Sequence, residues 1–225
     1  MAVMGAHKID NWIFDLDNTL YPAEAALFDQ IDARMTSYIM DKLGLAFDHA
    51  NTLRAHYWQL HGTTLAGLMI EHAIDPDDFL HHVHDICLAH MTPDQRLARA
   101  IDQLPGRKII HTNGSRCHAE RVLDACGLRD AFDAIYGVDD LALHPKPKSK
   151  AFELLCARAD IAPTSAAMIE DTERNLYHPY FMGMQTILVG DNLDQPPHVM
   201  YVTNDLTQFL TNTLQQMGQD GQTPG

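Results

Sequence analysis

Short apolar runs alternate along this chain with segments in which apolar residues recur every three or four positions. The first run, in Lys8–Leu16, is almost continuously apolar, which is typical of a strand buried on both faces of a parallel sheet. Later runs predict strands at Lys108–Thr112, Ala134–Tyr136, Ala167–Ile169, Gln185–Val189 and Met200–Thr203. Strands that alternate with helices predict right-handed βαβ units on one parallel sheet.

One long interval interrupts this alternation. Residues 22–95 contain four helical patterns and no strand pattern. These helices are expected at Glu24–Leu43, Ala50–Leu60, Thr64–Ala73 and Pro76–His90, and later ones at Cys117–Cys126, Ser149–Ala159, Leu176–Met182 and Leu206–Gln215. The sequence therefore predicts an α/β protein with a Rossmann-like parallel sheet core, residues 1–21 and 96–217. An all-helical cap at residues 22–95 is inserted into it, and residues 218–225 form a disordered tail.

Composition narrows the classes of partner. The 225 residues are 46% hydrophobic and 20% charged, which suits one large domain or a core with an insertion. A net charge of −14 argues against binding to a nucleic-acid polymer or an anionic membrane surface. No apolar run is long enough to span a membrane, and the N-terminus lacks a secretory pattern. The expected partner is a small molecule, and the oligomeric state is left open.

Cysteine and histidine residues give no sign of a structural metal or disulfide framework. The four cysteines lack CxxC spacing and are interpreted as reduced thiols of a cytoplasmic protein. His81, His82 and His84 fall within a helical pattern. They are interpreted as a solvated or half-buried helix face, because they lack the ligand spacing of a zinc site.

Two carboxylates follow the first strand directly. Side chains alternate along a strand, so Asp15 and Asp17 are expected on the same side. Two like charges so close repel each other and require a cation or a shared proton. Mg²⁺, which prefers carboxylate oxygens, is the natural partner. Taken alone, however, such a pair is more often an acidic turn.

Other strands also end in polar residues. In open parallel sheets, ligands bind at the carboxyl ends of the strands. The residues concerned are Thr112, Asn113 and Gly114 after the second strand, Lys146 in a later loop, and Glu170 and Asp171 after another strand. A nucleophile, oxygen ligands, amides and a fixed cation are what phosphoryl transfer requires. Lys148 and Lys150 compete with Lys146, and Asp139–Asp140 is a rival carboxylate pair.

Taken together and in this order, these residues resemble the four motifs of the haloacid dehalogenase superfamily, over about residues 9–190. The motifs are Asp15–Leu20, Thr112–Gly114, Lys146–Pro147 and Glu170–Asp171. Within the superfamily, the chain is similar to the pyrimidine 5′-nucleotidase subgroup. That similarity lies in Leu20–Tyr21, Tyr57–Leu65, Lys146–Phe152, Glu170–Leu176 and the helical insertion itself.

The resemblance implies roles for these residues. Asp15 would be the nucleophile that forms an aspartyl-phosphate, and Asp17 would protonate the leaving oxygen and then activate water. Both would contribute to the Mg²⁺ site, Asp17 through its backbone carbonyl, and Glu170 and Asp171 would complete it. Thr112, Asn113 and Gly114 would hold phosphate oxygens, and Asn18 is a further candidate for substrate binding. Lys146 is preferred because it precedes Pro147, and Glu170–Asp171 because the pair follows Lys146 and a clear apolar strand.

The same resemblance separates branches of the superfamily. Haloacid dehalogenases proper lack the second aspartate, so Asp17 favours phosphate chemistry. His111 stands where the family usually carries a larger apolar or aromatic residue, a departure expected to affect the strand and not the chemistry.

Substrate choice is expected to lie in the cap. Tyr57, His61, Thr63 and Thr64 are candidates to face the substrate, with Tyr57 stacking on a base. The alternative is that Tyr57 belongs to the core of the cap and the threonines cap a helix. The expected function is a Mg²⁺-dependent phosphatase of nucleoside monophosphates such as UMP or CMP. A sugar-phosphate phosphatase, a phosphomutase and a non-enzymatic phosphate-binding module are the alternatives.

Overall fold

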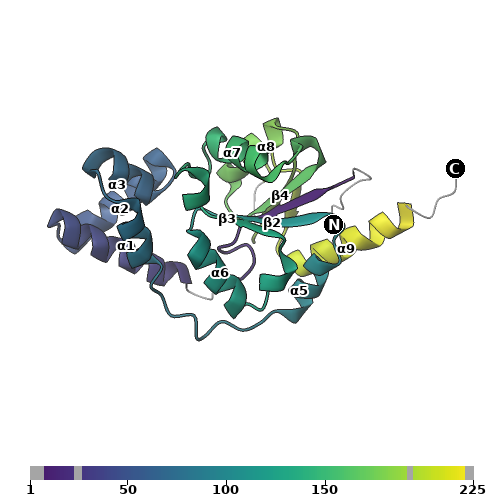
Figure 1. Cartoon of the computed structure of the whole chain (residues 1–225), viewed down its shortest axis with the longest axis horizontal. Helices are drawn as coiled ribbons and strands as arrows, with labels where there is room; N and C mark the ends of the chain where they lie inside the picture. Colours follow the sequence, from purple (N-terminus) through teal and green to yellow (C-terminus); the bar gives the residue numbers. More distant parts are fainter. Residues whose placement is uncertain (1–7, 23–26, 192–194, 221–225) are drawn as a thin grey trace.

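The computed structural model describes residues 8–22, 27–191 and 195–220. A single six-stranded sheet, entirely parallel, runs through the molecule in the order β3-β2-β1-β4-β5-β6. The strands are β1 (Asn11–Phe14), β2 (Arg107–His111), β3 (Ala134–Tyr136), β4 (Ala166–Glu170), β5 (Gln185–Val189) and β6 (Tyr201–Thr203). The predicted α/β fold with a parallel sheet is confirmed (Figure 1).

The central strand β1 explains the continuous apolar run. It pairs with β2 and β4, so that Trp12 lies between Lys108 and Ala167 in register. Trp12 and Phe14 pack into the cluster on one face of the sheet, and Ile13 packs into the cluster on the other. Every residue of β1 and β4 is buried, as expected for a sheet that is covered on both faces.

Helices cover the two faces. One face packs against α5 (Gln95–Asp102), α6 (Arg116–Ala125) and α9 (Leu206–Asp220), and the other packs against α7 (Ser149–Ala159). The short helix α8 (Tyr177–Phe181) follows a 3₁₀ turn at Glu173–Leu176 that begins soon after β4.

The helical insertion forms a separate group with its own core. It consists of α1 (Leu27–Leu43), α2 (Phe47–His61), α3 (Thr64–His72) and α4 (Pro76–Val83). Tyr38, Ile39, Tyr57, Leu68 and Phe79 belong to its buried cluster. Figure 1 shows α1, α2 and α3 together at one end of the molecule, apart from the helices that flank the sheet. We call this group the cap.

Several predicted boundaries are wrong. Helix α4 ends at Val83, not near His90, because the chain leaves the cap there and Ile86 is buried in the core cluster below the sheet. Thr63, not Thr64, caps α3: its hydroxyl accepts a hydrogen bond from the amide of Ala66. Residues 23–26, where the first helix was expected to begin, lie outside the described residues.

Two elements near α9 also differ from expectation. Helix α5 was not predicted, although Asp94 caps it and Leu97 and Ile101 anchor it in the core. Helix α9 runs to Asp220, so the expected disordered tail is wrong for residues 218–220, and residues 221–225 lie outside the described part. The extension is favoured because Met217 packs against the core cluster. Within the described ranges, no helix combines the length and apolarity needed to cross a membrane.

Gly106, in the turn before β2, packs closely against the backbone of Asp10, and this packing can be tested. The residue has φ +81°, and a Cβ there would lie 2.4 Å from the carbonyl oxygen of Asp10. Gly44 also has positive φ (+66°), but it has open space around it. Gly44→Ala should therefore cost about 1 kcal/mol of unfolding free energy. Gly106→Ala should cost about 2 kcal/mol more, because of the added overlap. Urea unfolding measures both, and equal losses would contradict the packing described.

Candidate active site

Parallel pairing brings the predicted motifs to one edge of the sheet. Asp15 follows β1, and its amide continues the ladder by donating to the carbonyl of Ile169 (2.8 Å). Thr112 follows β2, and its amide donates to the carbonyl of Tyr136 on β3 (3.1 Å). Glu170 is the last residue of β4. Since β1 lies between β2 and β4, the three carboxyl ends meet around Asp15.

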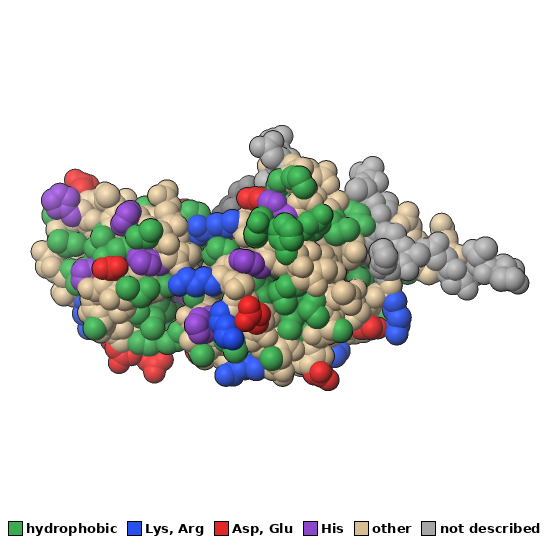
Figure 2. All heavy atoms as spheres, turned by 90° about the horizontal axis from the view of Figure 1, so that it is seen from above, with side chains coloured by type: hydrophobic (Ala, Val, Ile, Leu, Met, Phe, Trp, Pro, Cys, Tyr) green, Lys and Arg blue, Asp and Glu red, His purple; other side chains and the backbone are tan. Residues whose placement is uncertain are grey.

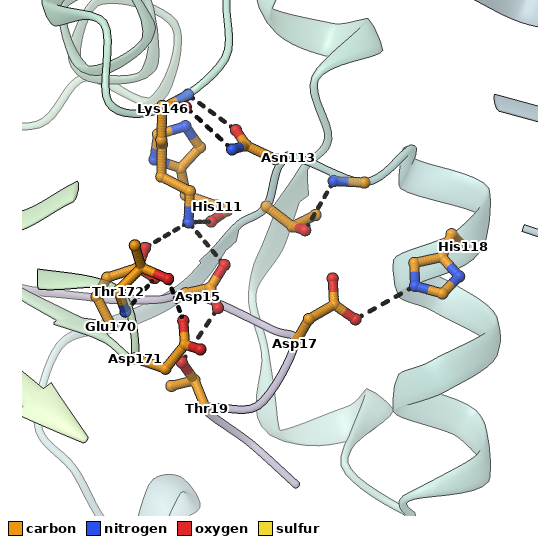
Figure 3. A network of polar contacts seen from close by, with 12 residues as sticks. Asp15, Asp17, Thr19, His111, Asn113, His118, Lys146, Glu170, Asp171 and Thr172 are labelled. Carbon is orange, nitrogen blue, oxygen red and sulfur yellow. Dashed lines mark hydrogen bonds and ion pairs between the residues drawn. The ribbon is translucent and has the colours of Figure 1, made fainter. Parts of the chain in front are cut away.

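Lys146 lies at the centre of this site. Its side chain is 1% exposed, and its ammonium donates to Asp15 Oδ1 (2.6 Å), Glu170 Oε2 (2.7 Å) and the carbonyl of His111 (2.8 Å) (Figure 3). Burial alone would lower the pKa of Lys146, but Asp15 and Glu170 outweigh burial and raise it, so the residue remains a cation. The competing lysines, Lys148 and Lys150, are exposed.

Three carboxylates lie close together beside this ammonium, two of them in contact with it. One oxygen from each of Asp15, Glu170 and Asp171 lies within 4.8 Å of the others. Burial and neighbouring carboxylates raise the pKa of Asp15 to about 7 and that of Glu170 to about 7, and burial also raises the pKa of Asp171. An all-oxygen donor set whose carboxylates repel one another fits a hard divalent cation such as Mg²⁺.

Asp17 occupies a different environment. Strand β1 ends at Phe14, and residues 17–19 form a turn, so the alternation expected between Asp15 and Asp17 does not extend this far. Figure 3 shows the Asp17 carboxylate directed toward His118 on α6, away from the Lys146 group. Asp17 Oδ1 accepts hydrogen bonds from the Tyr21 hydroxyl (2.5 Å) and from His118 Nε2 (3.3 Å). Burial would raise the pKa of Asp17, but these two donors hold it below its usual value.

The loop after β2 is held by its own side chains. Thr112 Oγ1 accepts a hydrogen bond from the amide of Gly114 (2.9 Å). The Gly114 amide, which was predicted to hold a phosphate oxygen, is therefore engaged within the loop. The side chain of Asn113 donates to the carbonyl of Lys146 (3.1 Å) and accepts from its amide (2.8 Å). Asn113 therefore fixes the loop that carries the buried lysine.

The side chain of His111, at the end of β2, stays out of the polar group. Its ring packs edge-on against Phe152, with centroids 5.4 Å apart. Burial and the nearby Lys146 hold the pKa of His111 well below its ordinary value, so the ring is neutral. Its backbone carbonyl accepts a hydrogen bond from Lys146, and whether the ring affects the chemistry stays a prediction.

A cavity of about 510 Å³ opens above Asp15, between the cap and the sheet edge. Its core wall contains Asp15, Asp17, Asn18, Thr112, Asn113, Gly114, Lys146, Glu170 and Asp171. Its cap wall includes Phe28, Asp32, Arg54, Trp58, Gln59, Thr63 and Thr64. Asn18 lines it from a left-handed turn conformation (φ 58°). The size is within the usual range for small-molecule sites.

Two of the four cap candidates do not line this cavity. Tyr57 is 7% exposed, and its hydroxyl hydrogen bonds to His72 Nε2 (2.8 Å) inside the cap. Its ring lies so close to Gly67 that a Cβ there would be 2.4 Å from the ring. His61 packs against the Tyr57 ring. The expectation that Tyr57 stacks on a base is therefore corrected: Tyr57 belongs to the core of the cap.

The structure adds residues that the sequence did not single out. The guanidinium of Arg174 lies 3.7 Å from the centroid of the Trp58 ring and donates to the carbonyl of Gly62 (3.2 Å), joining core to cap. Arg54 pairs with Asp32 (2.7 Å) in the cap wall. Figure 2 shows Lys and Arg side chains gathered along the middle of the face drawn there, between the cap and the α/β part. The only sequence signal for Arg174 was its place within the Glu170–Leu176 segment.

The rival pair Asp139–Asp140 has another use. Asp139 accepts a hydrogen bond from the amide of Arg116 (3.0 Å), and Asp140 forms an ion pair with the Arg116 side chain (2.8 Å). Neither residue lines the cavity. These carboxylates therefore anchor the start of α6.

A parallel α/β sheet whose carboxyl edge carries a buried lysine beside three carboxylates, under a helical cap, defines a capped α/β protein with a charged site at that edge. The sequence pattern of the haloacid dehalogenase-like hydrolases matches residues 9–176. The chain belongs to this hydrolase family.

Individual relatives share the sequence or the fold. Phosphate metabolism protein 8 of Saccharomyces cerevisiae is 26% identical over 193 residues, covering 79% of this chain, which spans about 60% of that protein's length. CbbY from Rhodobacter sphaeroides, solved in complex with phosphate, has 20% identity and a TM-score of 0.61, over 89% of this chain and 96% of CbbY. The HAD-hydrolase YfnB from Bacillus subtilis, solved bound to magnesium, has 14% identity and a TM-score of 0.59, over 92% and 99%.

Asn113→Ala tests how firmly the lysine loop is held. The substitution removes both hydrogen bonds to the backbone of Lys146 and should lower the unfolding free energy by about 1–2 kcal/mol. The matched control is Asn204→Ala at an exposed asparagine, expected to change stability by less than about 0.5 kcal/mol. Chemical denaturation measures both, and an Asn113→Ala variant as stable as the control would contradict this role.

Proposed function

We propose that this hydrolase is a Mg²⁺-dependent phosphomonoesterase that acts on a small phosphorylated metabolite, most favourably a nucleoside 5′-monophosphate. The observation that carries the proposal is the separation of two carboxylates at the floor of one cavity. Asp15 lies among Lys146, Glu170 and Asp171, whereas Asp17 is held apart by Tyr21 and His118. Two carboxylates in different environments suit two different roles.

In the proposed reaction, a carboxylate oxygen of Asp15 attacks phosphorus while the ester P–O bond breaks. The leaving oxygen keeps the electron pair of the broken P–O bond and accepts a proton from Asp17. Asp17 then removes a proton from water, which attacks the aspartyl-phosphate and releases inorganic phosphate. The charge of the bound phosphate would raise the pKa of the neighbouring Asp17, which favours its protonated form at the first step.

The remaining polar groups neutralise and orient charge. Lys146 holds Asp15 and offsets phosphate charge, and Thr112 lines the cavity beside it. Glu170 and Asp171, with Asp15, would hold Mg²⁺, which supplies charge neutralisation at the phosphoryl group when bound. The phosphate on CbbY and the magnesium on YfnB, both proteins of this fold, are in keeping with such a site.

The cavity supports a substrate of nucleotide size. Beyond the polar floor, the cap wall offers the indole of Trp58, half exposed beside Arg174, the Arg54–Asp32 pair, Gln59 and Thr63. An aromatic face combined with polar groups suits a planar base with hydrogen-bonding edges. Trp58 takes the part that the sequence reading gave to Tyr57.

The function is tested by phosphate release in the presence of Mg²⁺ from a panel that includes UMP, CMP and sugar phosphates. Asp15→Asn should reduce turnover by at least about 10³-fold, because the covalent route loses its nucleophile. Asp124→Asn, at an exposed aspartate of α6, is the control. Full activity of Asp15→Asn would rule the proposal out, and interconversion of sugar-phosphate isomers without net phosphate release would identify a phosphomutase instead.

Metal binding should depend on pH in a defined direction. The folded-state pKa values of Asp15 and Glu170, both about 7, lie above the unfolded values, so these protonated groups favour the folded state at low pH. That stability is lost as pH rises toward and through 7. Mg²⁺ competes with these protons, so it should raise the melting temperature more at about pH 8 than at about pH 5.5.

Asp171→Asn is the variant that tests this linkage. Removal of one of the three carboxylates should shrink the Mg²⁺-induced rise at the higher pH. Differential scanning fluorimetry, with EDTA as the metal-free reference, measures the effect. Equal shifts at both pH values, or an undiminished shift in Asp171→Asn, would contradict a magnesium site at these residues.

A further inference from the structure

Asp17 is held by a histidine to which the reaction above assigns no part. His118, in the first turn of α6, is 1% exposed, and its Nε2 lies 3.3 Å from Asp17 Oδ1. The facing atom is a carboxylate oxygen, so Nε2 carries the proton and donates. Tyr21 donates to the same Oδ1. Both bonds end on one oxygen, so within the described residues Oδ2 is the atom left to exchange a proton with a substrate.

The histidine is itself backed by the chain that leaves the cap. The ring of His84, the residue after α4, stacks on the ring of His118 with centroids 4.1 Å apart and planes within 13°. His84 Nδ1 lies 3.1 Å from Ser115 Oγ, which accepts a hydrogen bond from the amide of His118 (3.2 Å), so Ser115 links the two histidines.

Arg121 secures the backbone at His84 and two residues beyond it. Its guanidinium donates to the carbonyls of His84 (2.7 Å) and Ile86 (3.1 Å). The segment that returns from the cap is thereby attached to α6. His84 also lines the cavity, so the stack of two rings connects the end of the cap to the carboxylate of Asp17.

We propose that His118, supported by the stacked ring of His84, is a positioning residue that holds the Asp17 carboxylate in the orientation needed to protonate the leaving oxygen. The inference rests on the phosphomonoesterase function proposed above. Misorientation of a general acid by about 1 Å is enough to lower the rate of proton transfer substantially. Among the described residues, the His118 side chain forms no hydrogen bond with Lys146 or Thr112. Its effect on the rate is therefore expected to act through Asp17.

This role predicts dependence on the leaving group. The first step forms the Asp15–phosphorus bond and breaks the ester P–O bond, and the ester oxygen takes the proton of Asp17. An alkoxide needs that proton, whereas 4-nitrophenolate is a stable anion that departs without it. The value of kcat/KM reports only steps up to the departure of the leaving group, so later hydrolysis of the aspartyl-phosphate does not obscure the comparison.

The test compares His118→Phe with the wild-type protein on two esters. His118→Phe keeps an aromatic ring against His84 but removes the donor. For the best alkyl phosphate of the panel, kcat/KM should fall about 10–100-fold, and for 4-nitrophenyl phosphate it should fall less than about 3-fold. His49→Phe, at an exposed histidine of α2, is the control for the substitution itself. Equal losses on the two esters would overturn the inference.

Two further variants separate positioning from folding. His118→Gln retains an N–H donor and should recover most of the activity on the alkyl ester, which a merely structural role does not require. If His118→Phe does not fold, His84→Ala leaves the donor in place and removes its support. That variant should show the same selective loss, and a loss shared by both esters would count against the proposal.

The failure of this inference can be told apart from the failure of the proposed function. A wild-type protein that hydrolyses neither ester would overturn the function. A crystal structure of His118→Phe tests the positioning directly, without reference to activity: the Asp17 carboxylate should leave the orientation seen in Figure 3. An unchanged Asp17 rotamer would overturn the positioning role.

Discussion

A buried lysine ammonium shared by two carboxylates and a carbonyl is the interaction on which this site depends. Lys146 contributes the charge that lets Asp15 and Glu170 lie side by side without solvent. Removal of either partner would leave an uncompensated buried charge, which is strongly destabilising. From the neighbouring strand end, Asn113 holds the backbone of Lys146 and so helps to place the ammonium. The loop, the sheet edge and the carboxylates therefore form one unit.

The cap contacts the α/β part at two points beside the cavity. Arg174, soon after β4, contacts Trp58 and Gly62, and His84, at the end of α4, stacks on His118 of α6. The first contact joins the segment after Glu170 and Asp171 to the aromatic wall of the cap. The second joins the end of the cap, through His118, to Asp17. A change in the position of the cap relative to the sheet would therefore alter both contacts.

Much of the fold was predictable because its signals are local. The buried strands β1 and β4 are almost wholly apolar, and α7 has both predicted ends, since apolar periodicity alone defines such elements. The prediction failed where tertiary contacts decide. Helix α5 is short and polar on average and is stabilised by burying Leu97 and Ile101, and α9 continues past Gln215 because Met217 reaches the core. The same limit explains Tyr57, whose place inside the cap depends on His72 and Gly67.

By itself, the sequence determined the order of the strands' polar ends, and with it the convergence of Asp15, Thr112, Lys146 and Glu170 at one sheet edge. Parallel strands with right-handed crossovers permit few other arrangements. Only the tertiary structure decided which groups surround Asp17. The turn after β1 breaks the two-residue alternation, and His118 approaches from a helix about a hundred residues further along the chain. Hydrogen bonds between residues so distant depend on how helices pack on the sheet, and no local pattern encodes them.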